Sequence, residues 1–104
     1  MKIAVSSQQP DVNSAIDPRF GRAAYFVIYD TESGEIETID NLANANQAHG
    51  AGTGTAQFVV NKHVDVVVAG NLGPKAEQVL QAAGIRFVQQ TDGTVQSAID
   101  AVKQ

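Results

Sequence analysis

The sequence contains no cysteine, and this absence excludes three kinds of chemistry at once. Without thiols the chain forms no disulfides, holds no iron–sulfur cluster through thiolates and has no cysteine nucleophile. It also lacks any run of about 18 apolar residues, so we expect no membrane span. The segment Met1–Val5 leads directly into an expected strand, without the apolar stretch and cleavage site of a signal peptide. We therefore expect a cytoplasmic protein.

Basic residues are scarce as well. Seven Lys and Arg stand against eleven Asp and Glu, which gives a net charge of −4, and there is no basic run. Sequence-independent binding of DNA or RNA needs clustered Lys and Arg to neutralise phosphates, so we expect no nucleic-acid partner. With 43% apolar and 17% charged residues, the composition is that of an ordinary globular protein. A length of 104 residues predicts one domain over residues 1–104.

The most informative stretch runs from Val64 to Pro74. Four valines in its first five residues predict a strand buried on both faces, as in the middle of a parallel sheet. The strand stops at Gly70, and Gly73-Pro74 opens a helix, since proline suits a first helical turn. A loop between such a strand and a helix N-terminus is a usual ligand position, and it favours anions. The same glycines also fit a tight turn that binds nothing.

The remaining patterns predict the order βββαβαβα. Strands are expected at Lys2–Ser6, Tyr25–Asp30, Glu35–Asp40, 64–69 and Ile85–Val88, and helices at Thr55–Lys62, at Pro74–Ala83 and after Thr94. A hairpin joins the second and third strands, and right-handed crossovers join the later ones. The result is a mixed five-stranded sheet of order 3-2-1-4-5, with strand 2 antiparallel. This is an α/β, three-layer, ribonuclease H-like fold.

This topology brings the loops after strands 1, 4 and 5 to one sheet edge, with the loop of His49 nearby. The loop from Gln8 to Arg22 is long and polar, which is typical of functional or mobile segments. Its Arg19 and Arg22 either pair with Asp17 or Asp11 at the surface or supply positive charge to a pocket. Phe20 between them is expected to anchor the loop rather than to stack on a ligand.

His49 lies among small residues and glycines, where its imidazole would be accessible. It either contacts a metal or an anion or is merely exposed.

An enzymatic function fits the sequence less well than a binding function. A two-metal nuclease of this fold needs carboxylates on the first strand, which has none, and Asp65 lies at the wrong end of its strand. A hydrolase would need a nucleophile elbow, which is absent. We therefore expect that the protein is not an enzyme.

Five motifs occur in an order that resembles a known family. They are Pro18–Arg22, Ala48–Gly52, Val66–Pro74, Ala83–Ile85 and Gly93–Val95. With these motifs the chain resembles, almost end to end, the dinitrogenase iron–molybdenum cofactor biosynthesis family. That family comprises small ribonuclease H-like domains. It includes nitrogenase accessory proteins that carry the cofactor or its precursors, and a sulfate-reducer protein that holds a molybdenum–copper–sulfide cluster without covalent attachment.

The resemblance implies a pocket for an anionic metal–sulfur cluster, either of the iron–molybdenum or of the molybdenum–copper sulfide type, bound non-covalently. The family's motif residues carry over to Arg19, Phe20, Gly21, Arg22, His49, Gly50, Gly70, Asn71 and Gly73. His49 would be the only direct metal contact. The implied function is that of a carrier, a monomer or weak dimer, that exchanges clusters with a donor or acceptor protein. The alternative is a regulatory or adaptor domain that binds a protein partner or a small anionic metabolite.

Overall fold

The computed structural model describes residues 1–47 and 50–103. Its strands are β1 (Lys2–Ser7), β2 (Tyr25–Asp30), β3 (Ile36–Asp40), β4 (Val66–Ala69) and β5 (Arg86–Gln89). Its helices are α1 (Leu42–Ala45), α2 (Ala51–Asn61), α3 (Pro74–Ala82) and α4 (Val95–Lys103). None of the helices in these residues is long and apolar enough to span a bilayer.

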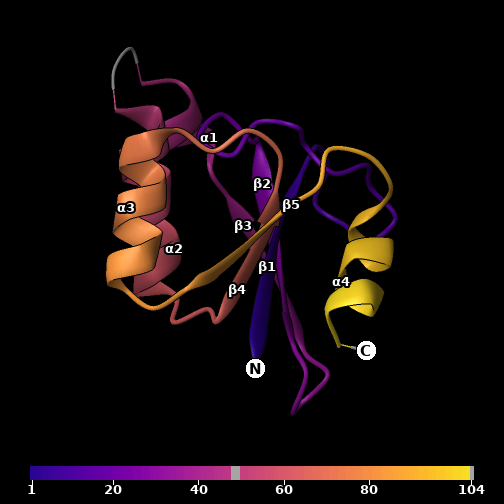
Figure 1. Cartoon of the computed structure of the whole chain (residues 1–104). Coiled ribbons are helices and arrows are strands. Elements are labelled where there is room, and N and C mark those ends of the chain that lie inside the picture. The colour runs from indigo at the N-terminus through magenta and orange to yellow at the C-terminus, as the bar shows by residue number, and fades with distance from the viewer. Residues whose placement is uncertain (48–49, 104) are drawn as a thin grey trace.

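The strands form one sheet of order β3-β2-β1-β4-β5. β2 is antiparallel to both of its neighbours, whereas β1, β4 and β5 run parallel. Helices α2 and α3 cover one face of the sheet and α4 covers the other, which gives three layers (Figure 1). The predicted order, the direction of the second strand and the α/β architecture are confirmed.

The boundaries of α2 correct the prediction. The helix begins at Ala51, four residues before the expected start at Thr55, and it includes Gly52 and Gly54. At Gly54 a neighbouring segment approaches closely, since a Cβ there would lie 2.9 Å from the Asn44 side chain. The approaching Asn44 belongs to α1, a short helix that is not among the predicted elements.

The core has two halves, one on each face of the sheet. Ala4 of β1 belongs to the cluster beneath α2 and α3, and its neighbours Ile3 and Val5 belong to the cluster beneath α4. All four residues of β4 are buried. A strand whose successive side chains pack on opposite helix layers must be apolar throughout, so the prediction of a doubly buried central strand is confirmed.

The long loop after β1 is fastened to the sheet edge. Single β-bridges join Ala15 to Thr94, after β5, and Arg19 to Asn71, after β4. Phe20 is 1% exposed and packs edge-on against Phe26, with ring centroids 5.6 Å apart. The prediction that Phe20 anchors the loop is confirmed, and three loops converge at one edge as expected.

Gly70 is the point at which the long loop crosses the end of β4. The Asn71 amide donates to the Pro18 carbonyl at 2.8 Å, and the Phe20 amide donates to the Asn71 carbonyl at 3.2 Å. A Cβ on Gly70 would overlap the Pro18 carbonyl group. Glycine is therefore required here for close approach of two backbone segments.

A buried asparagine joins the segments around the helix N-termini. Asn41 is fully buried, and its amide nitrogen donates to the Ala23 carbonyl at 2.9 Å and to Thr55 Oγ1 at 3.1 Å. Thr55 Oγ1 in turn donates to the Gly21 carbonyl at 3.1 Å. This network fixes α2 relative to the loop that carries Gly21.

We predict that Gly70→Ala destabilises the protein by at least about 2 kcal/mol, because the added methyl group forces the backbone at Pro18 away. Urea denaturation measures this cost. Gly73→Ala is the matched control: its Cβ meets nothing within 4 Å, so only the weaker N-cap preference of alanine is felt, about 0.5 kcal/mol. Equal losses in the two variants would contradict the crossing argument.

We also predict that Asn41→Ala costs about 2–3 kcal/mol, because it leaves the Ala23 carbonyl without its buried donor. The exposed Asn13→Ala should change the unfolding free energy by less than about 0.5 kcal/mol. Chemical denaturation of both variants distinguishes a structural network from a dispensable contact. An Asn41→Ala variant as stable as the Asn13→Ala control would refute the role of the network.

Candidate anion-binding site

A depression of about 400 Å³ lies between the N-termini of α2 and α3. Its lining consists of Gly50–Thr53 from α2 and Gly73–Ala76 from α3. The two helices start at the same end of the molecule and lie side by side on one face of the sheet (Figure 1). Both positive dipole ends therefore open on the same space.

Both helices begin with a glycine N-cap, so neither has a side-chain cap. The first N–H groups of a helix have no partner within the helix, and here no capping side chain occupies them. A Cβ on Gly50 or on Gly73 would meet nothing within 4 Å, which means that both positions face open space. Gly50 additionally adopts a φ of 77°, a conformation that favours glycine. These two predicted site residues lie at the depression.

Lys75 is the charged residue among those that line the depression, and its side chain is exposed. Lys75 is not among the site residues predicted from the sequence. A lysine in the first turn of a helix opposes the helix dipole, which favours acidic residues there. This unfavourable position is the feature of the sequence that could have indicated Lys75 as a site residue. With two helix N-termini and an ammonium group, the depression is suited to an anion.

Gly21 lies directly behind the first turn of α2. A Cβ at this position would lie 2.7 Å from the backbone nitrogen and the Cα of Gly52. The absence of a side chain on Gly21 thus permits contact between the long loop and the backbone of α2. Gly21 supports the wall of the depression rather than lining it.

Arg19 forms an ion pair with Asp17, which was one of the two predicted alternatives. Its Nε lies 3.2 Å from Oδ1 of Asp17, and a second nitrogen lies 3.3 Å from Oδ2. The hydrogen bond and the negative charge of Asp17 raise the pKa of Arg19 above its ordinary value. The guanidinium therefore stays charged, but the buried Asp17 carboxylate compensates most of that charge.

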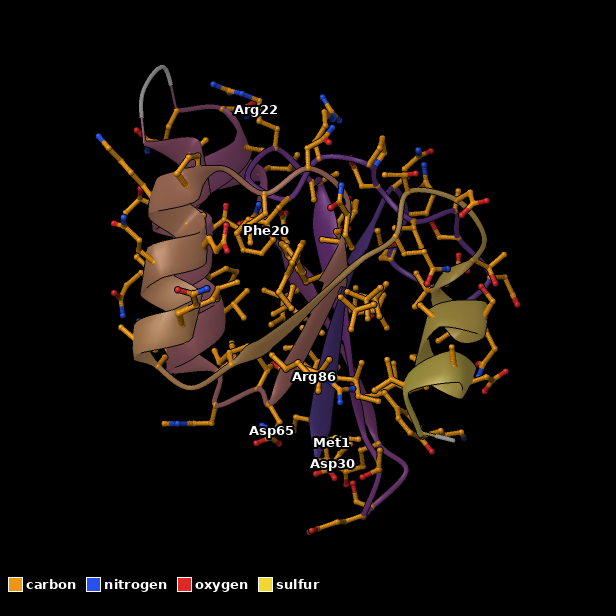
Figure 2. The ribbon with its side chains drawn as sticks, viewed as in Figure 1. Met1, Phe20, Arg22, Asp30, Asp65 and Arg86 are labelled. Carbon is orange, nitrogen blue, oxygen red and sulfur yellow. The ribbon has the colours of Figure 1, made fainter. Side chains whose placement is uncertain are left out.

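Arg22 does not pair with Asp17 or Asp11, so the first of the two alternatives given for it, an ion pair, is wrong. One of its terminal nitrogens donates to the Ala45 carbonyl at 2.6 Å and to the Gln47 carbonyl at 3.1 Å. Arg22 lies at the same end of the molecule as the two helix N-termini (Figure 2). The partners are backbone atoms of the segment that follows α1, so Arg22 fastens that segment to the long loop.

The other predicted residues lie at or behind the crossing. The side chain of Phe20 points into the core (Figure 2), so it is not available to a ligand in this structure. Gly70 is buried under the long loop, and the backbone of Asn71 is committed to that loop. The predicted metal contact, His49, lies outside the described residues. Among the described residues, no three His, Asp or Glu side chains gather as a metal site would require.

Comparison with known proteins identifies the lineage of the chain. An uncharacterized protein from Methanocaldococcus jannaschii is 41% identical over 88 residues, which cover 82% of this chain and 70% of the relative. The apo form of the orange protein from Desulfovibrio gigas is 42% identical, with a TM-score of 0.93, over 98% of this chain and 86% of that one.

A NifB-like protein from Thermotoga is also 42% identical, with a TM-score of 0.85 over the same shares of the two chains. Both solved structures confirm the fold. The family model described as dinitrogenase iron-molybdenum cofactor matches residues 1–104. The chain thus belongs to the dinitrogenase iron-molybdenum cofactor family.

Proposed function

We propose that this protein is a non-enzymatic carrier that binds an anionic metal–sulfur cluster in the depression between α2 and α3. Membership in the dinitrogenase iron-molybdenum cofactor family supports this class of ligand. The observation that carries the proposal is the opening of two uncapped helix N-termini, beside Lys75, on one space of about 400 Å³.

The chemistry of the lining fits a cargo that must be released. The chain has no cysteine, so a cluster would be held by charge and by N–H donors to its sulfides rather than by thiolate bonds. The open glycine positions let a bulky ligand approach the backbone directly. In this proposal His49, which precedes the N-cap of α2 in the sequence, supplies the one direct metal contact. An iron–molybdenum precursor and a molybdenum–copper sulfide both satisfy these requirements.

The substitution Gly73→Asp should weaken uptake of tetrathiomolybdate strongly, whereas Gly73→Asn should retain a large part of it. Aspartate and asparagine have nearly the same size and are both good N-caps, and Gly73 already has the extended backbone that an N-cap needs. The two variants therefore differ mainly in a negative charge at the mouth of the depression. We expect the dissociation constant of Gly73→Asp to exceed that of Gly73→Asn by at least about tenfold, or 1.4 kcal/mol.

The measurement is anaerobic incubation with tetrathiomolybdate, with and without copper or iron, followed by desalting, an optical spectrum and metal analysis. Unchanged melting temperatures verify that both variants are folded. Equal uptake by both would place the ligand elsewhere. Stabilisation of the wild-type protein by nucleotides or sugar phosphates, without any effect of tetrathiomolybdate, would support the regulatory alternative instead.

Lys75→Gln should weaken tetrathiomolybdate binding by about tenfold, because it removes the ammonium group at the depression. Lys103→Gln is the matched control, since it removes the same charge from α4 on the opposite face of the sheet. Titration at low ionic strength, where unscreened charges act most strongly, gives both dissociation constants. Identical affinities for the two variants would argue that Lys75 does not contribute.

A further inference from the structure

The two edges of the sheet differ in charge. The segment that forms the β3 edge carries Glu35, Glu37 and Asp40, and such charges discourage pairing with another chain. The β5 edge carries a single charge, Arg86, followed by Phe87-Val88-Gln89. In Figure 1, β5 lies nearest the viewer, between α3 and α4, and no element of the described residues covers its outer side. Only β3 has the acidic protection that an edge strand commonly carries.

Hydrogen bonds at both ends of β5 fix the direction of its backbone groups. The Arg86 amide donates to the Asp65 carbonyl at 3.1 Å, and the Gln90 amide donates to the Ala69 carbonyl at 2.8 Å. Both bonds point toward the β4 side. Because backbone groups alternate along a strand, the N–H and C=O groups of Phe87 and Gln89 point to the outer side. The free edge thus offers two donors and two acceptors.

A groove of about 310 Å³ runs beside this edge, between β5 and α3, and Glu77, Gln81 and Arg86 form the polar part of its lining. Its apolar lining comes from Leu72, Leu80, Ile85 and Phe87. Phe87 is half-buried, since it packs on the cluster beneath α3 with part of its ring still exposed. An added strand would cover this groove while it satisfied the backbone groups of the edge.

We propose that the outer edge of β5 is a self-association surface, on which a second copy of this chain adds its own β5 in antiparallel orientation. With the two-fold axis at Val88, Phe87 of each copy faces Gln89 of the other. These residues exchange both of their outward hydrogen bonds, four in all. The two Phe87 side chains become diagonal neighbours on the α3 face, within the reach of aromatic rings.

The charges at the ends of the strand are complementary in this register. Arg86 of one copy lies opposite Gln90 of the other, two residues from Asp92. Each end of the paired strands therefore combines one positive and one negative charge, and no like charges are opposed. Antiparallel pairing of two copies through β3 would instead bring carboxylates together. A strand from an unrelated protein would lack this reciprocal match, so a second copy is the occupant that the edge favours.

The test is sedimentation equilibrium of the full chain from about 10 µM to 1 mM. Because only residues 86–90 of each copy pair, the interface is small, and we expect a dissociation constant on the order of 100 µM. Gln89→Pro removes an outward N–H without breaking a bond to β4, and it should raise that constant at least about tenfold. Gln89→Thr, which keeps the N–H group, should dimerise like the wild type.

A monomeric wild-type protein at 1 mM, or a dimer unchanged in Gln89→Pro, would overturn the proposal. Amide exchange of the wild-type protein gives a check that requires no substitution. The Phe87 and Gln89 amides should become more protected as the concentration rises, and constant protection would contradict the pairing. Since none of these residues lines the depression between α2 and α3, the outcome is independent of the proposed carrier function.

Discussion

The structure depends on one backbone crossing, at which the Pro18 carbonyl passes over Gly70 and accepts the Asn71 amide. This contact closes the long loop after β1 onto the carboxyl end of β4. It holds Phe20 in the core and Gly21 against the first turn of α2. The start of α3 follows the crossing by three residues, so both helix N-termini are positioned from the same point. A loop that the sequence presents as irregular thus aligns the two walls of the depression.

The elements could be predicted wherever their signals are local. The valines around Val66, the hairpin turn after Asp30 and the Gly73-Pro74 pair each determine the nearby backbone through short-range preferences. Strand order followed from these elements because right-handed crossovers leave few alternatives. The convergence of the loops at one edge required no further information.

The wrong predictions concern residues whose conformation or hydrogen bonds depend on contacts with residues that are distant in the sequence. Gly52 and Gly54 are typical helix breakers, and the close approach of Asn44 to Gly54 is not visible in the sequence, so the predicted helix begins only after both glycines. The partners of Arg22 are carbonyl groups, which every residue has, so no residue type could have indicated them. Asn41 is fully buried only because three segments meet around it. Such contacts are properties of the assembled fold.

The glycine N-caps of α2 and α3 connect the occupancy of the depression to the stability of the whole domain. A helix that starts without a side-chain cap is less stable than one that begins with serine or aspartate, and here two adjacent helices share this deficit. An anion between them would cap both, and because the unfolded chain has no such site, binding would stabilise only the native state. At a concentration of one hundred times Kd this linkage amounts to about 2.7 kcal/mol. Under the proposed carrier function, the empty protein would then be the form most readily unfolded and cleared, and the loaded one would persist.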